Sequence, residues 1–121
     1  REVISPMKEL GKKGEDLAVA LCRRKGFTII EQNYRTPFGE IDIIAKDGNI
    51  FVFIEVKART GDAYGAPFEA VTSRKRKKIT KVAMSYLKRF KKEVPARFDV
   101  ISISMKSGNP DLEYIQDAFE V

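Results

Sequence analysis

Residues 39–57 read GEIDIIAKDGNIFVFIEVK, two apolar runs joined by Asp47-Gly48. An Asp-Gly pair between two strand-like runs is a strong signal for a β-hairpin. The second run is apolar at every position from Ile50 to Ile54, which predicts a strand covered on both faces. We therefore expect a hairpin whose strands occupy residues 39–46 and 49–59.

The buried second strand continues into two charged residues, Glu55 and Lys57. Because side chains alternate along a strand, both share the face of Phe51 and Phe53. A carboxylate or an ammonium group on a buried face is costly unless it is paired or bound to a metal. The two residues therefore need partners, and the first strand of the hairpin can supply them.

A two-residue turn at Asp-Gly would pair Lys46 with Asn49. This register puts Glu40 directly opposite Glu55 and Asp42 diagonal to it, so that all three acids and Lys57 emerge on one face. Carboxylates placed together repel one another, and a hard divalent cation such as Mg²⁺ or Mn²⁺ relieves that repulsion. The alternative is a structural ion pair of Lys57 with Glu55 or Asp42 and no metal.

The metal interpretation has a chemical use. Carboxylates can hold a cation on a phosphate oxygen, the cation lowers the pKa of a bound water, and a lysine can position that nucleophile or stabilise the developing charge. This chemistry needs no histidine, and the chain has none, which excludes Ser-His-Asp and Cys-His catalysis and His-ligated zinc. The single cysteine, Cys22, excludes an internal disulfide and Cys-cluster metal sites, and its helical pattern favours a buried filler.

The net charge of +6 is unevenly distributed. Residues 70–92 contain ten lysines and arginines and no acid, whereas the rest of the chain has 13 basic and 17 acidic residues. This asymmetry predicts a surface that faces nucleic acid, with a merely solvated helix face as the alternative.

Hydrophobic periodicity predicts the remaining elements. Helices are expected at 7–25 and about 68–91, and strands at 27–34 and 97–105, while the tail at 112–119 fits either an edge strand or a short helix. The order αβββαβ predicts a single α/β domain over residues 1–121, with a mixed sheet flanked by helices. No apolar run is long enough to span a membrane, and we expect a reduced, cytoplasmic protein.

Gly39-Glu40-Ile41-Asp42 followed by Glu55-Val56-Lys57 resembles the signature of the PD-(D/E)xK nuclease superfamily, especially its archaeal Holliday-junction-resolvase branch. More closely, the chain resembles the YraN-like proteins, a small bacterial family with a restriction-endonuclease-like fold. The matching stretches are Gly14 to Ala18, Asn33 to Arg35, Gly39 to Ala45, Phe53 to Arg59, Gly65, Ala70-Val71 with Lys75, Phe98 to Val100, and Ala118-Phe119. The proline of the signature's name is absent, since Ile41 precedes Asp42.

The resemblance implies roles for individual residues. Asp42 and Glu55 would be the metal carboxylates, Lys57 the catalytic lysine, and Glu15 an additional acid that reaches the metal or its water. Glu40 would be a more distant or alternative ligand. The implied activity is that of a Mg²⁺- or Mn²⁺-dependent DNA endonuclease acting on branched or flapped DNA. The oligomeric state is left open, although resolvase-like proteins act as dimers and a two-sided substrate would favour a homodimer.

DNA contacts are expected through the backbone and its shape rather than through base edges. Lys75 is the first choice for a phosphate contact because it belongs to the matched pattern and begins the basic segment. The other predicted contacts are Arg35, Arg59, Tyr64, Arg74 and Lys78. Two rival hypotheses are a non-catalytic nucleic-acid-binding module with the same fold and a protein whose basic helix binds an acidic protein partner.

Overall fold

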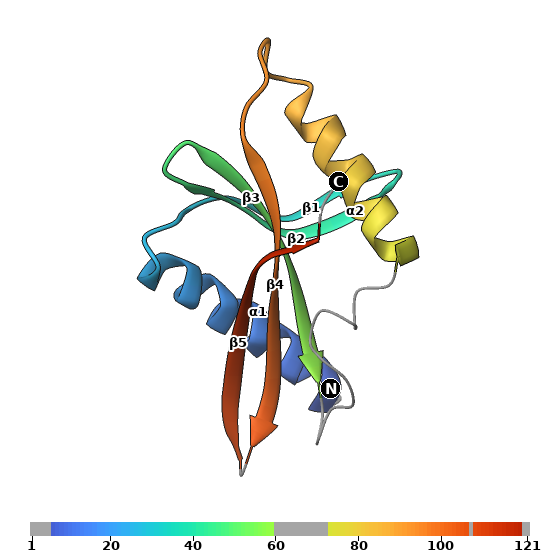
Figure 1. Ribbon diagram of the computed structural model, residues 1–121. Coiled ribbons are helices and arrows are strands. Elements are labelled where there is room, and N and C mark those ends of the chain that lie inside the picture. The colour runs from blue at the N-terminus through green and yellow to red at the C-terminus, as the bar shows by residue number, and fades with distance from the viewer. Residues whose placement is uncertain (1–5, 60–72, 107, 120–121) are drawn as a thin grey trace.

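The computed structural model describes residues 6–59, 73–106 and 108–119 (Figure 1). Two helices and five strands lie in these ranges. In chain order they are α1 (Pro6–Arg24), β1 (Thr28–Thr36), β2 (Gly39–Asp47), β3 (Ile50–Arg59), α2 (Ser73–Leu87), β4 (Ala96–Lys106) and β5 (Asn109–Phe119). The tail is thus a strand, which gives the order αβββαββ.

The five strands form one sheet in the order β1-β2-β3-β4-β5. β3 and β4 are parallel, and every other neighbouring pair is antiparallel. Parallel neighbours cannot be joined by a tight turn, and the long connection between β3 and β4 contains α2. The predicted α/β architecture, a mixed sheet flanked by helices, is confirmed.

Each face of the sheet has its own apolar core under one helix. β3 contributes to both, because Phe51 and Phe53 pack in the cluster with α2, while Val52 and Ile54 pack in the cluster with α1. Figure 1 shows the two helices separated by the strands. The prediction that β3 is covered on both faces is therefore confirmed, and so is the burial of Cys22 on the α1 side.

The hairpin register differs from the predicted one by two residues. Lys46 pairs with Phe51 rather than with Asn49, and the turn consists of Gly48 and Asn49. Gly48 adopts a φ of 62°, as expected for the first central residue of a glycine-led two-residue turn. Asp47 stays in β2, where its Oδ2 accepts a hydrogen bond from Arg97 Nη1 at 3.0 Å.

A shift of two residues leaves the side chains of β3 on their predicted faces, because the period of a strand is two. In β2 the alternation breaks at one point, since Ile41 packs in the cluster with α2 and Ile43 in the cluster with α1. The residues that lie opposite one another on β2 and β3 do change. The predicted pair of Glu40 and Glu55 is wrong, since the observed ladder is shifted by two residues and ends at the pair of Ile43 and Ile54.

The second helix is shorter than predicted. α2 ends at Leu87, and the predicted residues 68–72 lie outside the described part of the chain. After Leu87 the chain tightens, with the N–H groups of Arg89 and Phe90 donating to carbonyls three residues back. The Phe90 ring then packs on Phe51, with the ring centroids 4.9 Å apart. The helix therefore ends well before Pro95, which was expected to end it.

Candidate active site

β2 and β3 separate at the end of their ladder, and Asp42 occupies the gap. The last regular pair is Ile43 with Ile54, and beyond it the Val56 N–H donates to Asp42 Oδ2 at 2.8 Å. A backbone N–H that has lost its strand partner needs another acceptor, and a carboxylate makes a strong one. Asp42 is thereby fixed between the two strands that carry the candidate residues.

A hollow of about 230 Å³ opens over this point, beneath the first turns of α2. Gly39 begins β2 here with a φ of 146°, a backbone conformation that residues with a side chain rarely adopt. Glycine is therefore favoured at the start of the strand by its backbone conformation. The lining residues are Gly39, Glu40, Asp42, Glu55, Lys75, Lys78 and Ile79.

Glu55 is the buried acid of the site, with a side chain only 8% exposed. Its Oε1 lies 2.5 Å from Lys75 Nζ. Burial alone would lower the pKa of Lys75, but the hydrogen bond and charge of Glu55 raise it. Lys57 lies beside the pair, where burial and the neighbouring Lys75 ammonium lower the pKa of Lys57. Glu55 and Lys57 therefore share one face, as predicted.

Asp42 is surrounded by like charge. Burial, followed by the charge of Glu55, raises the pKa of Asp42 to about 7, and Glu15 and Glu40 add to the effect. The hydrogen bond from Val56 lowers this pKa but does not offset the rise. A carboxyl group in such a position is stabilised by a nearby cation.

In metal-free protein, we expect the free energy of unfolding to fall as pH rises from about 4 to about 7. The folded state holds the Asp42 proton more tightly than the unfolded state, so the contribution is present at low pH and is lost as pH passes the folded pKa. Asp42→Asn should flatten this dependence and be more stable than wild type at pH 8 by about 2 kcal/mol. Urea unfolding of both proteins at pH 5 and pH 8, with a chelator present, measures the pH dependence and the difference in stability. If the free energy of unfolding of Asp42→Asn changes with pH as much as that of wild type, the raised pKa of Asp42 is not its cause.

Glu15 and Glu40 meet at Asn33. With its amide nitrogen turned toward them, Asn33 donates to Glu40 Oε1 at 3.1 Å and to Glu15 Oε1 at 3.2 Å. Asn33 stands in β1 with a φ of 54°, a left-handed conformation that asparagine tolerates better than most residues. This contact brings α1 to the edge of the site, and no local pattern in the strand predicts a role for Asn33.

The oxygen donors match a hard divalent cation in kind, since all four candidate ligands are carboxylates. Within the ranges 6–59, 73–106 and 108–119, no three acid or other ligating side chains converge tightly enough to hold a metal ion. Glu55 is turned to Lys75, and Glu15 and Glu40 are turned to Asn33. Carboxylate oxygens are thus suitable ligands for a cation, and in this structure those of Glu55, Glu15 and Glu40 contact Lys75 or Asn33 instead.

Residues 14–103 match the model of the uncharacterised protein family UPF0102. This chain belongs to that family. A UPF0102 protein of Thermodesulfovibrio yellowstonii is 52% identical over 92% of this chain and 96% of the relative. A UPF0102 protein of Geobacter metallireducens is 49% identical over 94% of this chain and 94% of the relative. One of Dictyoglomus thermophilum is 45% identical over 93% of this chain and 98% of the relative. The predicted kinship with the YraN-like proteins is confirmed.

One similar solved structure is that of SfsA from Pyrococcus furiosus in complex with Ca²⁺. It aligns with 95% of this UPF0102 chain and 65% of its own, at 11% identity and a TM-score of 0.34. Neither helix in the described residues is both long and apolar enough to cross a membrane.

The predicted DNA contacts of this UPF0102 chain fall into three groups. Lys75 and Lys78 line the hollow, and Arg74 is exposed at the start of α2. Arg35 is exposed on β1, where its Nε lies 3.5 Å from Glu40 Oε1. The Arg59 side chain and Tyr64 lie outside the described residues.

The other charges of the basic segment continue along α2 and the turn that follows it. Their side chains are largely exposed, so the basic surface extends away from the acidic hollow. The exposed members are Arg74, Lys77, Lys78, Lys81, Lys88, Arg89, Lys91 and Lys92.

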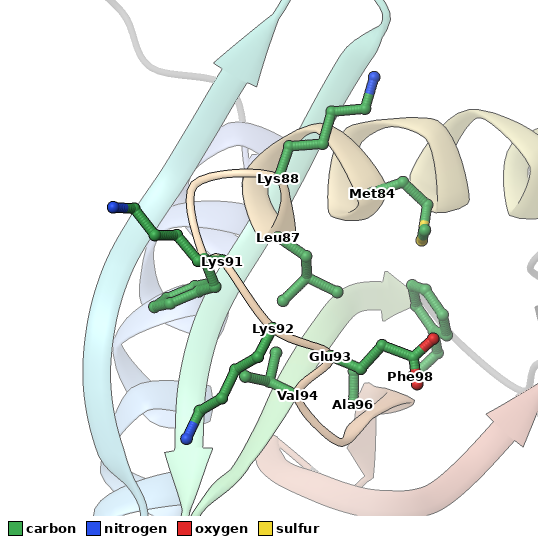
Figure 2. A pocket seen from close by; sticks show the side chains of 10 residues that line it. Met84, Leu87, Lys88, Lys91, Lys92, Glu93, Val94, Ala96 and Phe98 are labelled. Carbon is green, nitrogen blue, oxygen red and sulfur yellow. The ribbon is translucent and has the colours of Figure 1, made fainter.

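A larger hollow of about 580 Å³ lies at the opposite end of α2 (Figure 2). Leu87, Val94 and Phe98 are among its apolar lining residues, while the lysines at its rim point outward in Figure 2. Glu93 is the acidic residue of its lining, and none of the candidate acids reaches it. This second hollow is therefore separate from the candidate active site.

A buried cluster of charged and polar side chains around Asp99 on β4 was not predicted from the sequence. Asp99 is fully buried and accepts hydrogen bonds from Arg97 Nε at 3.0 Å, from the Asp117 N–H at 2.8 Å, and from the Tyr114 hydroxyl. Arg97 also binds Asp47, at the far end of β2 from the candidate site. The cluster joins β2, β4 and β5, which points to a structural role.

Proposed function

We propose that this protein is a Mg²⁺- or Mn²⁺-dependent DNA endonuclease that hydrolyses phosphodiester bonds. The observation that carries the proposal is that Asp42 and Glu55 line one hollow and Lys57 interacts with both, at the start of a helix whose exposed side chains are largely basic. Carboxylates that can hold a cation, and a lysine that can act on the attacking water, thus lie beside a positively charged helix surface that can bind DNA phosphate.

Asp42 and Glu55 would hold the cation, with Glu15 and Glu40 as further or alternative ligands. When bound, the cation would polarise the scissile phosphate and lower the pKa of a water molecule. Asp42 is already fixed by the Val56 N–H, so its carboxylate needs little reordering. Lys57 lies on the same strand face as Glu55 and would orient the attacking water or stabilise charge on the phosphate.

DNA would be held through its backbone by the exposed lysines and arginines of α2. Lys75 and Lys78 line the hollow itself, which puts them nearest to the phosphate that is cut. Contacts of this kind do not depend on base sequence, and they weaken steeply as salt rises.

Branched or flapped DNA is the substrate we propose, and an exposed aromatic ring beside the site supports it. Phe38 lies in the turn between β1 and β2, immediately before Gly39 of the hollow, and is 54% exposed. The turn is shaped by Thr36, whose Oγ1 accepts from the Phe38 N–H at 3.1 Å. An exposed ring held near the cut site can stack on an unpaired base. Two copies of the chain would meet the two sides of a four-way junction.

We expect Phe38→Ala to reduce the preference for flapped over fully paired DNA by about tenfold, because one base-stacking contact is lost. Competition cleavage of the two substrates measures the preference. The matched control is Met84→Ala, since Met84 is similarly exposed, at 49%, but lies at the other end of α2. Equal effects of the two substitutions would rule out a specific role for Phe38.

A cleavage panel tests the proposal itself. Purified protein is incubated with linear, flapped and four-way DNA under a titration of Mn²⁺ and of Mg²⁺, with DNA affinity measured in parallel at several salt concentrations. Metal-dependent nicking of one substrate supports the proposal. Salt-sensitive binding without any cleavage supports the non-catalytic binding module instead, and absence of DNA binding points to an acidic protein partner.

A further inference from the structure

The ion pair between Glu55 and Lys75 links the acidic site to the basic helix. Glu55 is almost fully buried, whereas the Lys75 side chain is 37% exposed. The lysine thus reaches from the surface of α2 into the site, and its Nζ lies 2.5 Å from Glu55 Oε1. A buried carboxylate needs a counter-charge, and Lys75 supplies it here.

The same two side chains are required for other contacts. The proposed function makes Glu55 a ligand of the cation and Lys75 a contact of DNA phosphate. Glu55 Oε1 cannot serve both Lys75 and a cation at full strength, because the two positive charges would compete for one carboxylate. Lys75 likewise cannot remain on Glu55 while it neutralises a phosphate at the surface.

Lys57 is a third charged side chain beside the pair. Its ammonium lies close enough to Lys75 for the two charges to act on one another, and Asp42 and Glu55 face both. Departure of Lys75 would remove this repulsion and leave Lys57 beside Glu55. A DNA phosphate bound outside the hollow would offer Lys75 a new partner at the protein surface, where the lysine side chain is already partly exposed.

We propose that Lys75 couples the two binding events: it occupies Glu55 in the free protein, and DNA phosphate draws it away so that Glu55 becomes available to the cation. The inference rests on the proposed function and adds a reason for tight cation binding to await substrate. Linkage requires the effect to be reciprocal, so a bound cation must raise the affinity for DNA by the same factor.

The test is the affinity for Mn²⁺ alone, measured by electron paramagnetic resonance titration of metal-free protein without DNA. Lys75→Met keeps the aliphatic stem and removes the charge, and it should raise Mn²⁺ affinity about tenfold. Lys75→Gln, which retains a hydrogen-bond donor for Glu55, is the second variant in case Lys75→Met folds poorly. With duplex DNA present, and with Mn²⁺ bound by DNA alone subtracted, the affinity should rise in wild type and change little in either variant.

Lys78→Met is the matched control, because Lys78 lines the same hollow one turn further along α2. General loss of positive charge near the site would raise Mn²⁺ affinity equally in the two methionine variants, and that result overturns the inference. Wild type that binds Mn²⁺ equally well with and without DNA also overturns it, while the proposed function stands. If no variant binds Mn²⁺ at any concentration, both proposals fail.

Discussion

Asp42→Asn is expected to slow Mn²⁺-dependent DNA cleavage by about a hundredfold or more while DNA affinity stays within about threefold of wild type. The asparagine side-chain oxygen can still accept the hydrogen bond from the Val56 N–H, so the gap between β2 and β3 remains filled. What is lost is the negative charge that would hold the cation. Single-turnover cleavage and equilibrium DNA binding separate the two effects.

The control for this experiment is Asp16→Asn on α1. Asp16 is exposed and adjacent in sequence to Glu15, so it carries the same change in charge close to the site along the chain. Cleavage by this variant should match wild type. Full activity of Asp42→Asn, or equal losses of cleavage and binding, would contradict the role given to Asp42.

The largest loss of stability is expected from Asp99→Ala, at about 3 to 5 kcal/mol in the free energy of unfolding. The substitution leaves the Arg97 guanidinium half-paired in the core and removes the acceptor for the Tyr114 hydroxyl and the Asp117 N–H. Urea unfolding in the presence of a chelator measures the loss without interference from a cation.

Two comparisons make the Asp99 result specific. Asp16→Ala changes an exposed aspartate and should stay within about 0.5 kcal/mol of wild type. Asp99→Asn keeps acceptors for the Arg97 cluster and should fall between the other two variants. A loss below about 1 kcal/mol for Asp99→Ala would show that the cluster is not a structural support.

The faces of the second hairpin strand, β3, were predictable even though the register of the hairpin was not. Asp47-Gly48 is the commoner turn dipeptide, but Asp47 is held in β2 by Arg97, a residue fifty positions away in the chain. The register moved by two, and the alternating pattern from Phe51 to Lys57 kept its faces. The observed register has the long-range ion pair of Asp47 with Arg97 and not the turn that the local dipeptide favours. The alternation of side chains along β3 is the same in both registers.

The candidate acids could be gathered from the sequence, but their partners could not. Strand alternation places Glu55 and Lys57 together, whereas the pairing of Glu55 with Lys75 depends on how α2 lies over β3. The contact of Asn33 with Glu15 likewise depends on α1 reaching the end of β1. Such contacts follow from packing between elements, which the periodicity of each element alone does not describe.

The buried cluster around Asp99 shows the same limit. In the sequence, Asp99 is one acid in an alternating strand, next to Phe98 and Val100. Opposite those two neighbours, a bulge in β5 shifts the register by two residues, and the Asp117 N–H reaches the Asp99 carboxylate. No pattern in the strand predicts the bulge, so the pairing could not be predicted either.

Metal-dependent cleavage by this protein is tested by single-turnover reactions of wild type and Lys57→Ala, purified side by side, on flapped and four-way DNA with and without Mn²⁺. We expect cleavage by wild type only when Mn²⁺ is present, and a loss of about a hundredfold or more in Lys57→Ala with DNA binding retained. No cleavage by wild type, or equal cleavage by the two proteins, would contradict it.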